Sequence, residues 1–242
     1  MSPKLIGGRS QQMKAKILCY HKVDDGSNEG RRLNVEPRRL ETHIRYYARH
    51  GRNFVTAREF PGRVPAGSVC FTFDDAYLST MRNAPELLER YGARGTFYAV
   101  AGLLGQSSVW DGQRASRLAA AEDLSQAQAR GHEIGNHSMH HPRMSGLEPS
   151  EQRREVLDAH ERLLDLGLDI ESFCYPYGSY DDATLEVMRE AGYRAAVTLK
   201  KGPVTGNDDL LELPRIVIGY GDALPSFLYK TTLRQKLRKL GL

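Results

Sequence analysis

The chain has 242 residues, 40% of them hydrophobic and 26% charged, which is enough apolar sequence for one full hydrophobic core. Its net charge of +4 is spread along the chain with acids between the basic residues, so we expect a solvated mixed-charge surface and no nucleic-acid partner. No apolar run is long enough for a membrane span and no early segment has the pattern of a signal peptide, which excludes a membrane-embedded class.

The N-terminal residues bear on the bounds of the main domain, and the cysteines bear on the cellular compartment. Residues 1–15 lack hydrophobic periodicity and are expected to form a mobile leader. Cys19, Cys70 and Cys174 each lie in a short apolar run without CxxC spacing, so we expect buried free thiols in a reducing compartment. These features predict a cytoplasmic protein with its main domain at 16–222.

From Lys16 onward, short apolar runs alternate with longer amphipathic segments, a pattern typical of β/α units around a parallel sheet. Predicted strands lie at 16–23, 53–57, 69–73, 96–100, 132–137, 172–176, 195–199 and 214–218. Predicted helices lie at 37–51, 83–92, 150–167 and 182–192. Glycines stand where a left-handed C-cap would end a helix, at Gly51, Gly92, Gly131, Gly167 and Gly192. About eight strands in this length favour a closed or partly closed β/α barrel over an open doubly wound sheet, which has the same local pattern.

Three predicted strands end in residues that carry chemistry. Asp74 and Asp75 follow VCFTF, while His137, His140 and His141 follow the strand that begins HEIGN. CYPYG ends a third strand. Because the carboxyl ends of parallel strands meet at one rim, we expect these groups to lie together.

Two histidines four residues apart and one aspartate match a catalytic divalent-metal site that keeps open positions for water. One aspartate of the pair can bind the cation while its neighbour acts as base, and the charge of the cation offsets the repulsion between the carboxylates. Alone, an Asp-Asp pair is usually a turn or a helix cap, and a His-rich stretch is often a polar loop. Their coincidence at the ends of two predicted strands favours the metal site.

The remaining histidines have other interpretations. His43, His50 and His160 lie in amphipathic helices and are expected at the surface, and His132 at a strand entrance is expected to be structural. His21 ends the first predicted strand on the same rim as the acids. It is therefore a candidate to line the substrate pocket.

Together these motifs resemble those of the polysaccharide deacetylases with a NodB homology domain, carbohydrate esterase family 4, from about Lys16 to about Gly219. TFDD, which ends in Asp74 and Asp75, is similar to the first motif of the family. That match implies a catalytic base at Asp74 and a metal ligand at Asp75. The family fold is a distorted β/α barrel, so the resemblance implies seven to eight mostly parallel strands of the NodB type.

The second and third motifs are also matched. HSMHH is similar to the second motif and implies metal binding by His137 and His141. YPYG resembles the third, which implies that the backbone N–H of Tyr177 faces the oxyanion and that Pro176 and Tyr177 meet the substrate. The implied cofactor is one divalent ion, with zinc expected and cobalt, nickel or manganese as alternatives.

The sequence departs from the family pattern in three places. Cys174 stands where many members have an arginine that orients the base, and Ala76 stands where a glycine often follows the aspartates. The late motifs, which supply the usual general acid, have no clear counterpart near ELPRIVIGYGD. Arg215 in that stretch is a candidate to orient Asp74 in catalysis.

The resemblance implies removal of an acetyl group from an N-acetylhexosamine unit of a glycan or a lipid-linked sugar. Asp74 would accept a proton from the attacking water, and either Asp74 or His21 would protonate the leaving amine. Two alternatives stay open: a metal-dependent hydrolase of a small non-sugar amide on the same fold, and a catalytically weakened glycan-binding homologue. The oligomeric state is left open.

The C-terminal segment, residues 223–242, is basic. At helical spacing its apolar face would hold Phe227, Leu228, Leu233, Leu237 and Leu240. Its positive side would hold Lys230, Arg234, Lys236, Arg238 and Lys239. We expect either a terminal helix packed on the barrel or a helix in peripheral contact with an anionic membrane at its inner face.

Overall fold

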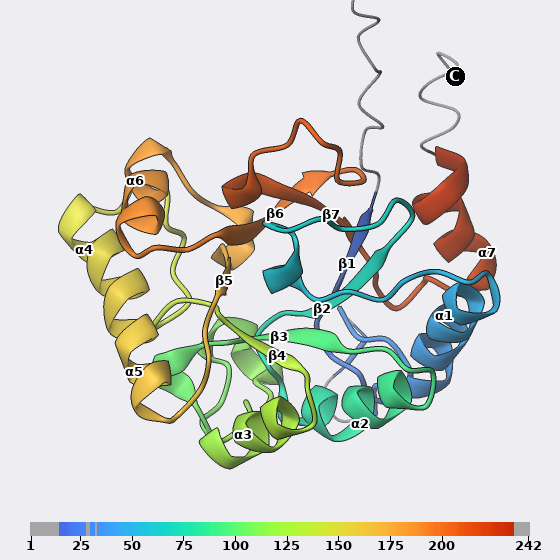
Figure 1. Cartoon of the computed structure of the whole chain (residues 1–242). Coiled ribbons are helices and arrows are strands. Elements are labelled where there is room, and N and C mark those ends of the chain that lie inside the picture. The colour runs from blue at the N-terminus through green and yellow to red at the C-terminus, as the bar shows by residue number, and fades with distance from the viewer. Residues whose placement is uncertain (1–14, 28–29, 32, 235–242) are drawn as a thin grey trace, which may run out of the picture.

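Seven parallel strands close into a barrel in the order of the chain (Figure 1). The computed structural model describes residues 15–27, 30–31 and 33–234. β7 closes the barrel on β1 through the pairs Leu18–Ile216 and Cys19–Val217. The strands are β1 Lys16–Tyr20, β2 Val69–Phe73, β3 Gly95–Ala99, β4 Glu133–Asn136, β5 Ser172–Cys174, β6 Ala195–Lys201 and β7 Leu213–Val217. The predicted α/β barrel of the NodB type, with seven to eight parallel strands, is confirmed.

β2 and β3 are buried along their whole length, which explains why their sequences are continuous apolar runs, whereas β6 ends in two exposed lysines. Alternate side chains of each strand point into the barrel or toward the helices. One cluster fills the barrel, with Ile17, Cys70, Tyr98, Cys174, Val197 and Leu213 among its members. The larger cluster lies between the strands and the helices around them. The barrel is therefore a packed core whose polar chemistry lies at one end.

The strand predicted at 53–57 is wrong. Only an isolated bridge between Phe54 and Val69 forms there, and a 3-10 helix follows at Ala57–Glu59. The turn is stabilised by Thr56, whose backbone N–H donates to the Glu59 carboxylate at 2.7 Å. This Thr-x-x-Glu spacing is a helix-capping pattern, and it outweighs the β propensity of the short apolar run.

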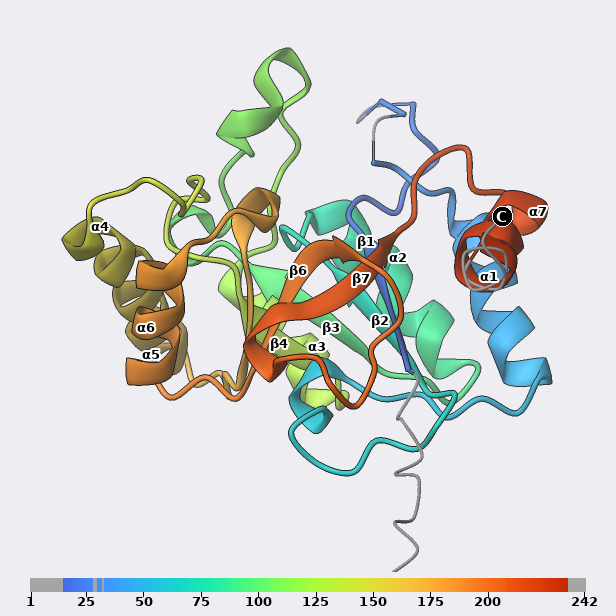
Figure 2. The ribbon, with the colours of Figure 1, turned by 90° about the horizontal axis from the view of Figure 1, so that it is seen from above.

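The helices lie around the barrel on the side of β1 to β5, and the β6–β7 side carries mainly loops (Figures 1 and 2). They are α1 Pro37–Arg49, α2 Leu78–Glu89, α3 Ala121–Ala129, α4 Pro149–Arg153, α5 Ala159–Asp165, α6 Asp182–Glu190 and α7 Leu224–Leu228. A π-helical turn, Arg154–Asp158, joins α4 to α5, so the predicted helix at 150–167 is one interrupted element. α2 begins five residues before its predicted start. All five predicted cap glycines have left-handed φ values between 60° and 88°.

The ends of the described chain pack on the barrel. Ala15, which the sequence placed in the leader, is buried and pairs with Val204 in an antiparallel bridge; the rest of the predicted leader lies outside the described residues. α7 packs against α1, and Phe227 is fully buried there. Leu233 is 49% exposed, and the predicted face and charges at 236–240 lie outside the described residues.

His43 corrects the expectation that it lies at the surface. Its ring is buried and stacks on Phe227 with 3.8 Å between centroids. One ring nitrogen lies 3.1 Å from the Tyr20 hydroxyl and the other 2.8 Å from the Asp222 carbonyl. α7 packs on α1, and His43 lies in the surface of α1 that α7 covers. The sequence pattern of α1 alone does not show this contact. His160 is only half-buried and contacts the Tyr193 hydroxyl, whereas His50 is exposed and His132 is buried as predicted. Among the described residues, no helix is long and apolar enough to cross a membrane.

Candidate active site

Residues from most strands gather at the carboxyl end of the barrel around a cavity of about 190 Å³. Every predicted site residue except Pro176 and Arg215 lines this cavity. Arg215 lies beneath it, fully buried, and Pro176 is buried under the rim, so the structure does not bring Pro176 to the cavity. The lining residues are His21, Leu33, Asp74, Asp75, Tyr77, Trp110, Asp111, His137, His141, Tyr175, Tyr177, Gly178, Leu199 and Val217.

Asp75, His137 and His141 form a compact group of possible metal ligands. One ligand atom from each lies within 4.8 Å of the others. The Nε2 atoms of His137 and His141 are 3.4 and 3.2 Å from Asp75 Oδ1. Burial raises the pKa of Asp75, but the two imidazoles outweigh it and hold that pKa well below its usual range. The carboxylate therefore faces the imidazoles in its ionised form.

The hydrogen bonds around this group suit a cation. His137 Nδ1 is 2.6 Å from the Cys174 carbonyl oxygen, which can only accept, so Nδ1 carries a proton and Nε2 is the ring nitrogen that faces Asp75 Oδ1. Asp75 Oδ1 is buried and has no hydrogen-bond partner among the described residues. Unpartnered buried carboxylate oxygens are costly, and a divalent ion would satisfy this one. The residues present therefore fit a divalent metal.

Backbone strain is concentrated at the same rim. All six described non-glycine residues with left-handed φ line the cavity or adjoin a residue that does: Leu33, Asp75, Ala76, Ser138, His141 and Tyr177. Each such residue costs roughly 1–2 kcal/mol, so the surrounding structure must hold it. Ala76 has φ 46°, which explains why a glycine suits this position in the resembled family.

The β7 arginine and the first aspartate form a bidentate ion pair. Arg215 Nη1 is 2.6 Å from Asp74 Oδ1, and Nη2 is 2.7 Å from Oδ2. The remaining donors of Arg215 reach the Thr198 carbonyl and the Thr72 hydroxyl. Nη2 also lies 3.2 Å from the sulfur of Cys174, so the guanidinium occupies the space beside the position where many family members have their arginine. Burial raises the pKa of Asp74, but Arg215 outweighs it and holds the pKa well below its usual range.

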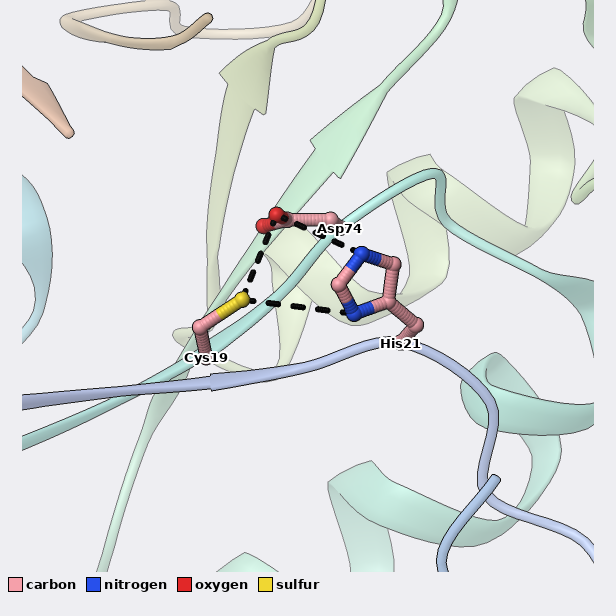
Figure 3. A group of neighbouring side chains, drawn as sticks. All are labelled: Cys19, His21 and Asp74. Carbon is pink, nitrogen blue, oxygen red and sulfur yellow. Dashed lines mark hydrogen bonds and ion pairs between the residues drawn. The ribbon is translucent and has the colours of Figure 1, made fainter. Parts of the chain in front are cut away.

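His21 approaches the same carboxylate from the end of β1 (Figure 3). Its Nε2 is 3.8 Å from Asp74 Oδ2, and its Nδ1 is 4.0 Å from the sulfur of Cys19. Cys19 in turn donates to Asp74 Oδ2 at 3.4 Å. The side chain of His21 is 15% exposed, so it can meet both Asp74 and a bound molecule.

Tyr177 follows β5 in a left-handed turn with φ 57°. Its ring is 40% exposed and lies 4.6 Å from that of His141. Within the described residues, no group accepts a hydrogen bond from the Tyr177 backbone N–H. This donor is therefore available at the edge of the cavity.

The π-helical turn holds the backbone of the second motif by hydrogen bonds. The Glu155 carbonyl in that turn accepts from the Met139 N–H, and the Glu155 carboxylate accepts from the N–H of His140 at 2.8 Å. π turns free backbone groups in this way and are frequent at functional sites. The His140 side chain is 66% exposed and pairs with Glu155, away from the ligand group.

Sequence reasoning missed the loop residues of the cavity. Trp110 and Asp111 lie between β3 and α3, and the Trp110 ring is 4.0 Å from the ring of His141. One signal was available, because Trp110 is the only tryptophan of the chain and lies in a polar loop where no core requires it.

Comparison with known proteins agrees with this geometry. The family model described as "Polysaccharide deacetylase" matches residues 62–196, more than half of the chain. The YxkH protein of Bacillus subtilis (strain 168), described as a candidate polysaccharide deacetylase, is 24% identical over 216 residues, 86% of this chain and 72% of that protein. The poly-beta-1,6-N-acetyl-D-glucosamine N-deacetylase of Staphylococcus aureus (strain MSSA476) is 24% identical over 242 residues, 90% of this chain and 82% of that protein.

Solved structures show the same fold. The Streptococcus pyogenes deacetylase PplD has a TM-score of 0.77 at 24% identity and covers 90% of this chain and 98% of its own. IcaB from Ammonifex degensii has a TM-score of 0.74 at 24% identity and covers 89% of this chain and 95% of its own.

Proposed function

Because the chain belongs to the polysaccharide deacetylase family, we propose that it is a metal-dependent carbohydrate N-deacetylase acting on an N-acetylhexosamine unit of a glycan or glycan precursor. The observation that carries this proposal is the convergence of two groups at one cavity. Asp75, His137 and His141 bring their ligand atoms together, and the adjacent Asp74 is held by a buried arginine.

Asp75, His137 and His141 would hold one divalent ion. Two nitrogen donors and one oxygen donor with open positions suit zinc, with cobalt, nickel or manganese as alternatives. When bound, such a cation polarises a carbonyl oxygen and lowers the pKa of water. The chain contributes the fixed tautomer of His137 and the ionised carboxylate of Asp75.

Asp74 acts as the general base. Arg215 keeps it ionised and fixes the plane of the carboxylate, so that it can accept a proton from the attacking water. Tyr177 contributes its unpaired backbone N–H, a preorganised donor for the oxygen on which negative charge develops. Loss of one such donor typically costs about a hundredfold or more in rate.

His21 supplies the proton to the leaving amine. Both oxygens of Asp74 face the guanidinium of Arg215, which disfavours a carboxylic acid there, whereas His21 is partly exposed and 3.8 Å from Asp74 Oδ2. This arrangement favours His21 over Asp74 as the acid. His21 would also be the general acid that the late motifs of the family usually supply and that has no clear counterpart in this sequence.

The substrate class is supported by the named relatives. Proteins described as acting on poly-beta-1,6-N-acetyl-D-glucosamine match 90% of this chain, so a β-1,6-linked oligomer of N-acetylglucosamine is the first substrate to test. Acetate release should be measured from N-acetylglucosamine oligomers and from small non-sugar acetamides. Release from the oligomers alone supports the proposal. Faster release from the small amides would favour the alternative amidase, and binding without release would favour the weakened glycan-binding homologue.

We also propose a cytoplasmic location, with the C-terminal segment in contact with an anionic membrane. Support comes from three buried free cysteines and from the acid-free sequence beyond Arg234. Phe227 packs in the core and Lys230 pairs with Asp222 at 2.6 Å, so neither is free to meet a membrane, whereas Leu233 is exposed. The full chain should float with anionic vesicles at low salt and a form ending at Arg234 should not. If the full chain did not float, the proposed membrane contact would be wrong.

A further inference from the structure

Residues 105–119, between β3 and α3, rise above the rim as an arm, the green segment at the top of Figure 2. Ser107 and Arg117 form an antiparallel bridge within it. The backbone N–H of Ser108 donates to the Ser116 carbonyl at 2.9 Å. The arm is therefore held by its own hydrogen bonds.

A buried lysine fixes the arm to the barrel. Lys22 is 4% exposed and follows β1. Its Nζ is 2.7 Å from the Ser116 hydroxyl, 3.0 Å from Asp111 Oδ2 and 4.6 Å from the centre of the Tyr77 ring. A buried ammonium group is costly unless it is paired in this way. Lys22 has no part in the proposed reaction, and its hydrogen bond and its ion pair both go to the arm.

The anchored arm brings one carboxylate to the cavity. Asp111 Oδ2 accepts hydrogen bonds from the Tyr77 hydroxyl at 2.8 Å and the Ser108 hydroxyl at 2.7 Å, in addition to its contact with Lys22. All of these contacts go to Oδ2, and no described residue donates to Oδ1. The side chain is 24% exposed and lines the cavity. Oδ1 is therefore a fixed, available acceptor.

The same arm places the indole of Trp110 beside the metal-ligand group. Its Nε1 donates to the Tyr77 hydroxyl at 3.2 Å, and its ring lies 4.0 Å from that of His141. Tyr177 contacts the same imidazole. Two aromatic rings and one acceptor therefore meet at the mouth of the cavity, a combination that binds the apolar face and the hydroxyl groups of a sugar.

The size of the cavity indicates where a glycan must continue. At about 190 Å³ it is smaller than the roughly 300–1,000 Å³ pockets that enclose a drug-sized ligand. The unit that carries the reacting acetamide can enter it, but a second unit must lie at the mouth. Trp110 and Asp111 line the cavity, are partly exposed and belong to the arm above the rim, so they are the candidates to meet that second unit.

We propose that Trp110 and Asp111 form a second sugar subsite, in which the indole packs on the pyranose next to the unit being deacetylated and Asp111 Oδ1 accepts a hydrogen bond from a hydroxyl of that pyranose. The proposal rests on the proposed function and narrows its substrate to a chain of at least two sugars. Lys22 is a positioning residue that acts through Asp111.

The chain has one tryptophan, so its intrinsic fluorescence reports on this subsite. The full-length protein, and Asp74→Asn as a form without turnover, should be titrated with N-acetylglucosamine and with its β-1,6-linked tetramer. The tetramer should shift the emission at concentrations at least about tenfold lower than the monosaccharide. Asp111→Ala removes the acceptor and should weaken the response to the tetramer, and Val109→Ala, a 71% exposed neighbour on the same arm, should not.

The outcomes separate this subsite from the reaction. Acetate release from the tetramer without a change in emission would overturn the subsite and leave the proposed function standing. A saturable change without acetate release would support the subsite and contradict the deacetylase. Equal responses to monosaccharide and tetramer, or no response and no release, would also overturn the subsite. If Asp111→Ala left the response unaltered, Asp111 would not be part of the subsite.

Discussion

Arg215 holds both carboxylate oxygens of Asp74, at 2.6 and 2.7 Å, although the two residues are 141 positions apart in sequence. The ion pair links β7 to the end of β2 across the inside of the barrel. The strand that closes the barrel therefore also carries the partner of the proposed base. In the proposed reaction, Arg215 would orient Asp74 in place of the arginine that many family members have at the position of Cys174.

Arg215→Lys should keep a positive charge but lose the planar, bidentate contact with Asp74. Misalignment of a catalytic group by about 1 Å can cost about a hundredfold, so we expect a fall of that order in kcat together with a lower Tm. Acetate release and thermal unfolding measure the two effects. Arg189→Lys, an exposed change on α6, is the control. A variant within a few-fold of the parent would show that the ion pair does not orient the base.

The two neighbouring histidines should differ in their effect on metal content. His141→Ala removes a proposed ligand, whereas His140→Ala removes an exposed side chain that pairs with Glu155. We expect the first variant to lose most of its divalent ion and the second to keep it, as measured by elemental analysis of the purified proteins. Equal loss from both would contradict the ligand assignment.

His21→Gln should affect amides and esters differently. An amine leaves only when protonated, but an aryl alcohol leaves without help, so general acid catalysis matters for the first and little for the second. We expect acetamide hydrolysis to fall by about a hundredfold or more and aryl acetate hydrolysis to stay within a few-fold. Equal losses on both substrates would assign His21 a structural or binding role.

His43 should make stability depend on pH. Burial lowers the pKa of His43 to about 4 from 6.5, despite its hydrogen bond to Asp222. As pH falls below 6.5 the unfolded chain takes up this proton and the folded chain does not, so stability is present above 6.5 and falls between 6.5 and about 4. The total is about 3 kcal/mol at about 1.4 kcal/mol per pH unit.

His43→Gln has no charge to gain and should lose less stability than the parent over the same pH interval. Denaturant unfolding at pH 7 and near pH 4 measures the difference between the two proteins. Equal losses in parent and variant would mean that His43 is protonated in the folded state.

The sequence predicted the barrel because each buried parallel strand is a continuous apolar run, and predicted Asp74, His137 and His141 at the rim because strand ends converge. It failed at 53–57, where a local Thr56–Glu59 cap replaces a strand. It also failed at His43, which is buried by α7 from the far end of the chain. Both failures concern contacts that hydrophobic periodicity does not encode.

The partners of Asp74 are also long-range contacts, which the sequence pattern does not show. Arg215 was a candidate from the sequence, but only the closed barrel shows that β7 brings it to β2. Trp110 and Asp111 were missed because a loop has no periodicity, and Lys22 was missed because a lysine at a strand end usually faces solvent. Long-range contacts between loops therefore determine which residues lie at the opening of the cavity.

The proposed deacetylation requires a divalent ion at Asp75, His137 and His141, and acetate release before and after chelation measures that requirement. The full-length protein should release acetate from the β-1,6-linked tetramer of N-acetylglucosamine, lose that activity with a chelator and regain it with zinc. Asp75→Ala should not regain it. Acetate release that survives complete removal of metal, or that zinc restores equally to Asp75→Ala, would show that the reaction does not depend on a divalent ion at these residues.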